Sequence, residues 1–151
     1  AFTENPKHGI SMLTIAKTAR LIGVDQLHIG AIFGKMKGGK KEVQAIGEDI
    51  EKDFVKNNPK EHLLTQKWHG IKPVFSVCSG GLWAGRIPEL IKAMGTDIIA
   101  QAGGGVHGHP DGTVAGAASM RQAVDAAMNG ITLRNNAKYN KELRMAIDKW
   151  G

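Results

Sequence analysis

Pro73-Val74-Phe75-Ser76-Val77-Cys78-Ser79-Gly80-Gly81 is the most informative segment of this 151-residue chain. Its first six residues form a short apolar run typical of a buried strand, and the two glycines indicate a tight turn after it. A helix is predicted next, because Ile87, Leu90, Ile91 and Met94 recur at helical spacing before Gly95. Strand, glycine turn and helix in this order form one unit of a parallel α/β sheet.

The same order recurs on both sides of this segment. Upstream, the sequence predicts a helix over 11–22, with Met12, Ile15, Ala19 and Ile22 on one face, a strand over 24–32, and a helix over 41–55. Val43, Ile46, Ile50 and Phe54 are expected on the buried face of the 41–55 helix, and the polar stretch 56–67, with Pro59, is expected to be a connection. Downstream, a strand over 97–101 and helices over 114–128 and 137–150 are predicted, with Leu143, Ala146 and Trp150 facing inward. The fold class is therefore α/β, in a single domain.

Composition excludes several classes of protein. Hydrophobic residues make up 42% and charged residues 23% of the chain, which excludes wholesale disorder and a fibrous protein. No run of 18 apolar residues and no signal peptide is visible, so neither a membrane span nor secretion is expected. One cysteine, Cys78, cannot form an internal disulfide and fits a reducing cytoplasm. Because the chain begins with Ala1, either a start residue was removed or the sequence is a piece of a longer protein.

Polar and glycine residues follow the predicted strands at the end where parallel sheets bind ligands. Two such segments are Ser79-Gly80-Gly81 and Gln101-Ala102-Gly103-Gly104-Gly105. Glycine lacks a Cβ atom, so its backbone N–H group can approach a phosphate closely. Their occurrence after consecutive strands favours phosphate binding, although tight strand-to-helix turns alone remain the alternative.

The first predicted strand and its loop supply two further candidates. His28 lies near the carboxyl end of the strand and has either a structural or a ligand-binding role. Lys35 lies in a loop with Gly34, Gly38 and Gly39, where it could place a positive charge near developing negative charge. The net charge of +6 is concentrated there, in Lys35, Lys37, Lys40 and Lys41, which form either a solvated turn or an anion site.

Other reactive residue types fit structural roles better. His107 and His109 form an HxH pair without a third ligand at a suitable spacing, so we expect structural or solvent-facing histidines and no metal site. Cys78 is expected to be a small buried thiol rather than a nucleophile. The acidic residues of the 41–55 helix are expected to form mainly a solvated face: Glu48, Asp49, Glu51 and Asp53.

In combination, these motifs resemble one known family. Five segments are similar in order and spacing to the large chain of ribulose-1,5-bisphosphate carboxylase (RuBisCO). They are Leu27-His28-Ile29-Gly30, Gly34-Lys35-Met36, Ser79-Gly80-Gly81, the segment 101–105 and Gly108-His109-Pro110. The segments 5–11 and 148–151 are similar to its archaeal form III branch. The resemblance covers essentially the whole chain.

The resemblance implies a place in a larger fold. Residues 1–151 would be a partial, C-terminal part of a (β/α)8 TIM barrel, its strands six to eight and the following helices. The N-terminal domain and the first barrel strands would be absent. Three strands cannot close a barrel of about 250 residues. The segment alone is expected to be inactive, because the metal ligands of the family are absent from it.

The resemblance also implies roles for particular residues. Lys35 would be the catalytic lysine that stabilises the carboxylate formed when CO2 adds to the enediolate of ribulose-1,5-bisphosphate. His28 would contact the substrate near its 5-phosphate, and Ser79 would hydrogen-bond a substrate hydroxyl. The cradle of the 1-phosphate would comprise Gly80, Gly81, Gln101, Ala102, Gly103 and Gly104.

Three residues depart from the family pattern: Ala31 replaces a common Thr, Lys37 stands at an acidic loop position, and Trp83 stands where His is common. These departures concern loop packing rather than the reaction class. RuBisCO-like enolases and isomerases generally lack the loop lysine, so Lys35 favours a true carboxylase. A non-catalytic phosphate-binding half-barrel is a further alternative.

The family further implies a cofactor, partners and a location. Mg2+ would be bound by residues that this sequence does not contain. The partners would be a sugar bisphosphate, CO2 or O2, the missing N-terminal part of the same chain, and further copies in a homodimer or larger homo-oligomer, with no nucleic acid and no membrane. The enzyme would be a lyase located in the cytoplasm. It would also react with O2 as a monooxygenase, which is an oxidoreductase activity. Form III implies a role in AMP metabolism.

Overall fold

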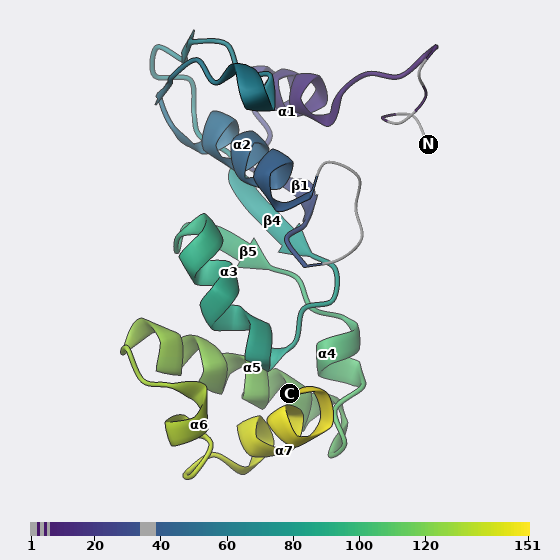
Figure 1. Cartoon of the computed structure of the whole chain (residues 1–151), viewed down its shortest axis with the longest axis vertical. Coiled ribbons are helices and arrows are strands. Elements are labelled where there is room, and N and C mark those ends of the chain that lie inside the picture. The colour runs from purple at the N-terminus through teal and green to yellow at the C-terminus, as the bar shows by residue number, and fades with distance from the viewer. Residues whose placement is uncertain (1–2, 4, 6, 34–38) are drawn as a thin grey trace. The chain divides into compact units, whose positions relative to one another are not determined.

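The computed structural model describes residues 3, 5, 7–33 and 39–151 (Figure 1). The chain divides into two compact units. Unit 1 comprises residues 1–78 and 97–99, and unit 2 comprises residues 79–96 and 100–151.

Unit 1 is organised by a three-stranded sheet with the order β1-β4-β5. The strands are β1 (Gln26–Ala31), β4 (Phe75–Ser79) and β5 (Ile98–Ala100). The backbone N–H of Phe75 donates to the carbonyl oxygen of Asp25 at 3.0 Å, so β1 and β4 begin side by side and run in the same direction. The α/β class and all three predicted strands are confirmed, with ends within two residues of those predicted.

The helix after β1 is shorter than predicted, and a second small sheet follows it. Helix α2 (Gly39–Glu51) ends four residues before the expected end. The segment predicted as helix end and connection instead contains an antiparallel pair, β2 (Phe54–Val55) with β3 (Gln66–Lys67), and the short 3-10 helix η2 (Pro59–Glu61). Strand alternation puts Val55 in the core and leaves Phe54 half exposed, so the predicted burial of Phe54 is wrong.

In helix α1 (Met12–Leu21), the buried side chains differ from those that the apolar pattern indicates. Its start is confirmed by Ser11, whose hydroxyl accepts from the Thr14 N–H. Ile22, which the spacing places on the apolar face with Met12, Ile15 and Ala19, is 74% exposed, whereas the charged Arg20 is buried. The prediction that Asp49 belongs to a solvated face is wrong, since Asp49 on α2 is fully buried. Two charged side chains therefore lie inside unit 1.

Unit 2 consists of helices. These are the 3-10 helix η3 (Ala84–Arg86), α3 (Ile87–Met94), α4 (Gly104–His107), α5 (Gly112–Met128), α6 (Leu133–Asn136) and α7 (Lys141–Trp150). The helix predicted over 137–150 starts later, at Lys141, and is preceded by α6, whose N-cap Thr132 accepts from the Asn135 N–H. Leu143 and Ala146 are buried as expected, and Trp150 is half-buried.

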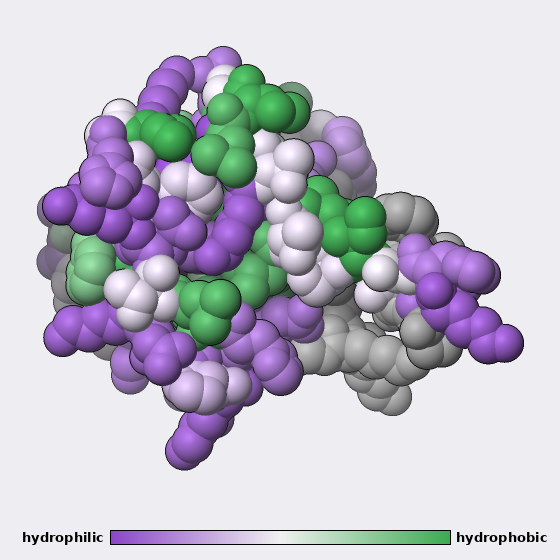
Figure 2. Space-filling view, turned by 90° about the horizontal axis from the view of Figure 1, so that it is seen from above, coloured by the Kyte–Doolittle hydropathy of each residue, from purple (hydrophilic) through white to green (hydrophobic). Residues whose placement is uncertain are grey.

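The surface is mixed in character. Figure 2 shows hydrophobic residues interspersed among polar ones on one face. The large apolar side chains that are most exposed in unit 1 are Leu21, Ile22 and Leu64. In the described part of the chain, no helix has both the length and the apolar character needed to cross a membrane.

Candidate functional site

The turn after β4 requires its glycines. β4 ends at the half-buried Ser79, and the next two residues have left-handed backbone angles, with φ of 80° at Gly80 and 64° at Gly81. A side chain would be strained at both positions. The tight-turn interpretation is therefore sufficient to explain these two glycines.

The glycines after β5 differ. Neither Gly103, whose φ is −91°, nor Gly104 has a left-handed backbone angle. A Cβ atom added at one or the other position would meet no described atom within 4 Å. Neither backbone strain nor packing requires glycine at Gly103 or Gly104. Gly105 is required by packing, because a Cβ atom there would lie 2.2 Å from the carbonyl oxygen of Leu82.

Unit 2 brings these two glycine segments together. Leu82 and Trp83 directly follow Gly81, and the Cα of Trp83 would lie 2.6 Å from a Cβ atom at Gly105. Gln101 is exposed and Ala102 is half-buried at the start of the second segment. The residues that directly follow the first glycine segment, Leu82 and Trp83, therefore lie against Gly105 of the second segment.

The remaining candidates lie elsewhere. His28 lies on β1 of unit 1 with an exposed side chain. Lys35 and Lys37 lie outside the described residues. Lys40 and Lys41 are exposed in the first turn of α2.

The cysteine is buried, as predicted. Cys78 has no solvent exposure, and burial alone raises the pKa of its thiol to about 11. A thiol with so high a pKa carries little thiolate at neutral pH and is a poor nucleophile.

The two histidines of the HxH pair have structural surroundings. The ring Nδ1 of His109 accepts from the Asp111 N–H at 3.0 Å, which leaves the proton on Nε2 to donate to the carbonyl oxygen of Glu142 at 2.9 Å. The exposed His107 has its Nδ1 3.2 Å from the hydroxyl of Thr113. Within the described residues, no group of three His, Cys, Asp or Glu side chains could hold a metal ion. The described residues therefore do not fit a Mg2+ site.

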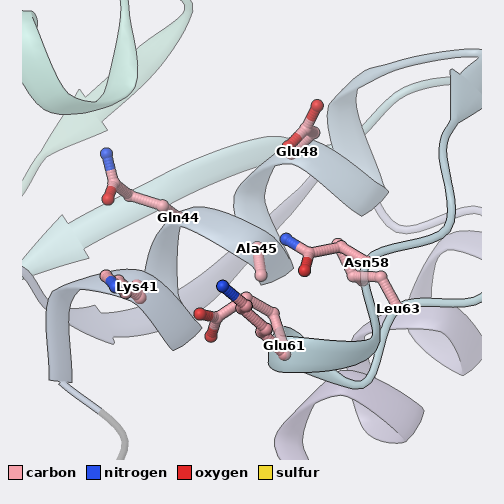
Figure 3. Close-up of a pocket in the computed structure, with 8 residues that line it drawn as sticks. Lys41, Gln44, Ala45, Glu48, Asn58, Glu61 and Leu63 are labelled. Atoms are coloured by element: carbon pink, nitrogen blue, oxygen red, sulfur yellow. The ribbon is translucent and has the colours of Figure 1, made fainter.

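A pocket of about 290 Å³ on unit 1 was not expected from the sequence (Figure 3). It lies between α2 and the η2 segment, and its charged residues are Lys41, Glu48, Lys60 and Glu61. Two cations and two carboxylates balance, so the pocket has no bias toward an anion.

Comparison with known proteins identifies the chain's relatives. Residues 1–150 match the family model described as "Ribulose bisphosphate carboxylase large chain, catalytic domain". A ribulose bisphosphate carboxylase of Methanosarcina acetivorans is 53% identical over 150 residues, which cover 99% of this chain and 35% of that protein. The chain therefore spans about a third of the length of this curated relative.

Solved structures agree with this match. The crystal structure of an archaeal RuBisCO superposes with a TM-score of 0.89 at 48% identity and covers 99% of this chain and 34% of that one. A dimeric archaeal RuBisCO from Hyperthermus butylicus gives a TM-score of 0.87 at 49% identity, with 99% of this chain and 35% of that one covered. The chain belongs to the family of ribulose bisphosphate carboxylase large chains, within their catalytic domain.

Proposed function

We propose that this chain is part of a ribulose-1,5-bisphosphate carboxylase. In that reaction, CO2 adds to the enediolate of the sugar bisphosphate, and addition of water and cleavage of a carbon–carbon bond give two molecules of 3-phosphoglycerate. Family membership and the carboxylase names of relatives near 50% identity support the proposal. The presence of Lys35 favours carboxylation over the enolase or isomerase chemistry of related proteins.

The observation that carries the site assignment is the open space around Gly103 and Gly104. Both glycines stand where a Cβ atom would fit the described chain, and neither has a left-handed φ. A bound phosphate explains them, because it can approach the backbone N–H groups closely only where side chains are absent. The proposed cradle for the 1-phosphate comprises Gly80, Gly81, Gln101, Ala102, Gly103 and Gly104.

Three side chains would act on the rest of the substrate. Ser79, at the end of β4, would hydrogen-bond a substrate hydroxyl. His28, on β1, would contact the substrate near the 5-phosphate. Lys35 would provide the positive charge that stabilises the new carboxylate.

The proposed site is only part of an active site. The parallel strands β1 and β4, with β5 beside β4, would be strands six to eight of a (β/α)8 TIM barrel, and residues 1–151 would be its partial C-terminal portion. The N-terminal part of the same chain would complete the barrel. Mg2+, which would stabilise the enediolate, would be held by residues outside this sequence.

Partners follow from the same proposal. The substrates would be ribulose-1,5-bisphosphate and CO2, with O2 as a competitor in a monooxygenase reaction. The dimeric state of the relative from Hyperthermus butylicus supports a homodimer or larger homo-oligomer. A cytoplasmic location and a role in AMP metabolism complete the proposal.

The test compares three alanine substitutions in the complete chain that contains these residues. In Gly103→Ala and Gly104→Ala, the KM for ribulose bisphosphate should rise about tenfold or more while the melting temperature is kept. The added methyl groups meet no described atom of this chain and would instead meet the phosphate. Gly105→Ala is the matched control and should lower the melting temperature, because its methyl group meets Leu82. An unchanged KM in the first two variants would contradict the cradle.

A further inference from the structure

We propose that helix α7 positions the phosphate cradle, and that Trp150 is its positioning residue through contact with Trp83. This inference rests on the proposed function and adds a role for helix α7. It concerns residues of unit 2 alone.

Trp83 lies at the junction of the two glycine segments. It is two residues beyond Gly81, and its Cα and Cβ lie against the backbone of Gly105, at 2.6 and 2.8 Å from a hypothetical Cβ there. A movement of Trp83 therefore displaces Gly105, because their atoms are in close contact. Gly105 is in turn covalently linked to Gly104 of the proposed cradle.

The indole of Trp83 is held from two directions. Its ring atoms would lie 2.0 to 2.5 Å from a Cβ atom at Gly85, so the ring lies directly on this glycine. The ring of Trp150 lies 5.8 Å away, centroid to centroid, at an interplanar angle of 46°. This tilted arrangement is a favourable one for aromatic pairs. Trp150 is thus a side chain of α7 that contacts the junction.

Helix α7 also contacts the segment after α4. Lys149 donates from Nζ to the carbonyl oxygen of Gly108 at 2.5 Å, and Nε2 of His109 donates to the carbonyl oxygen of Glu142 at 2.9 Å. A Cβ atom at Gly108 would lie 3.6 Å from the Trp150 ring. α7 therefore holds both Trp83 and the segment beyond the second glycine loop.

These contacts bear on phosphate affinity because hydrogen bonds to a phosphate need accurate backbone positions. A displacement of about 1 Å in a binding group can cost up to a hundredfold in activity. Loss of the Trp150 ring removes one side of the support of Trp83 and leaves the cradle residues themselves unchanged. Weaker binding of the bisphosphate is the expected result.

The experiment measures binding of ribulose-1,5-bisphosphate to the complete chain by calorimetry, together with KM and kcat. In Trp150→Ala, the Kd and KM for the bisphosphate should rise about tenfold, with a smaller change in kcat. In Trp150→Phe, most of the affinity should be recovered, because an aromatic ring remains. Leu143→Ala is the control, since Leu143 is a buried core residue of the same helix. It should lower the melting temperature by as much as Trp150→Ala and leave Kd unchanged.

Two outcomes overturn the inference alone. If Trp150→Ala binds the bisphosphate like the wild type, α7 does not position the cradle. If Leu143→Ala raises Kd as much as Trp150→Ala, the effect is one of general stability. By contrast, a wild-type chain that neither binds the bisphosphate nor fixes CO2 would overturn the proposed function, and this inference with it.

Discussion

The guanidinium carbon of Arg20 lies 4.3 Å from the ring centroid of Trp68, inside unit 1. Both side chains are almost fully buried. The guanidinium N–H groups donate to four backbone carbonyl oxygens at 2.7 to 3.2 Å, those of Asp49, Lys52, Ile71 and Lys72. Arg20 therefore joins the C-terminal end of α2 to the segment that leads into β4.

Replacement of this arginine should destabilise unit 1. Arg20→Lys keeps the charge but cannot reach four carbonyl groups or stack as a plane on Trp68, and leaves buried acceptors unsatisfied. We expect a loss of about 3 kcal/mol in the free energy of unfolding. Urea denaturation of the complete chain measures it.

The matched control is Arg121→Lys, which alters an exposed ion pair with Asp125 on α5. Its effect on the free energy of unfolding should be much smaller than that of Arg20→Lys, because water screens an exposed ion pair. Equal effects of the two substitutions would show that the buried network contributes nothing special.

Burial of Asp49 should make stability depend on pH. Burial raises the pKa of its carboxyl above the ordinary value, against the opposing effect of Lys17, whose Nζ lies 3.4 Å from Oδ1. A carboxyl with a raised folded-state pKa holds its proton more tightly when folded, so its contribution favours folding at low pH and is lost as pH rises from the unfolded to the folded pKa. Asp49→Asn removes this loss.

The measurement for Asp49 is the difference in urea midpoint between Asp49→Asn and the wild type at several pH values. The difference should move in favour of the Asn variant as pH rises above the ordinary range of an aspartic acid. Hydrogen bonds from Lys72 and Lys141 lower the carboxyl pKa values of Asp25 and Asp111, so these residues affect stability in the opposite direction. Both proteins contain them, and their effects therefore cancel in the difference. A pH-independent difference would be evidence against the buried carboxyl.

Cys78 should resist alkylation in the folded chain. A thiol with a pKa of about 11 has a thiolate fraction of about one thousandth at pH 8, whereas an ordinary cysteine has about one quarter. Labelling with iodoacetamide, followed by mass spectrometry of the peptide that contains Cys78, should show modification only after unfolding in urea. Rapid labelling without denaturant would contradict the burial of this residue.

Lys35 gives a prediction about the reaction itself. Lys35→Ala in the complete chain should reduce carboxylation by about a thousandfold or more, since a charge aimed at the developing carboxylate is lost. Proton abstraction from the sugar bisphosphate, followed by exchange with deuterium from solvent, should persist. Lys41→Ala, in the exposed first turn of α2, serves as the control. Wild-type carboxylation without Lys35 would refute the role given to it.

The periodic parts of the fold could be predicted from the sequence. The short apolar segments around β1 and β4 contain β-branched residues and are bounded by glycines, which favours strands, whereas the segment of α5 is long enough for a helix. The pair β2 and β3 could not be predicted, because each strand has two residues and Phe54 finds its partner Lys67 far along the chain. The later start of α7 depends on the capped helix α6 before it, which the apolar pattern does not reveal.

The burial of charged side chains could not be predicted from the sequence either. Arg20 and Asp49 are charged residues on helices, where polarity predicts exposure, yet both lie in the interior of unit 1. The candidate site was predicted in part: the sequence indicates which loops are rich in glycine, but not which glycines the backbone requires. Only the structure separates Gly80, with its left-handed φ, from Gly103, whose surroundings are open.

The most direct test of the proposed carboxylase is product analysis with isotopically labelled CO2. The complete chain, with Mg2+, is incubated with ribulose-1,5-bisphosphate and labelled CO2, and the products are identified by mass spectrometry. The proposal predicts two molecules of 3-phosphoglycerate per turnover, one of which carries the label. An unlabelled isomer or enol product, or binding of the sugar bisphosphate without turnover, would contradict it.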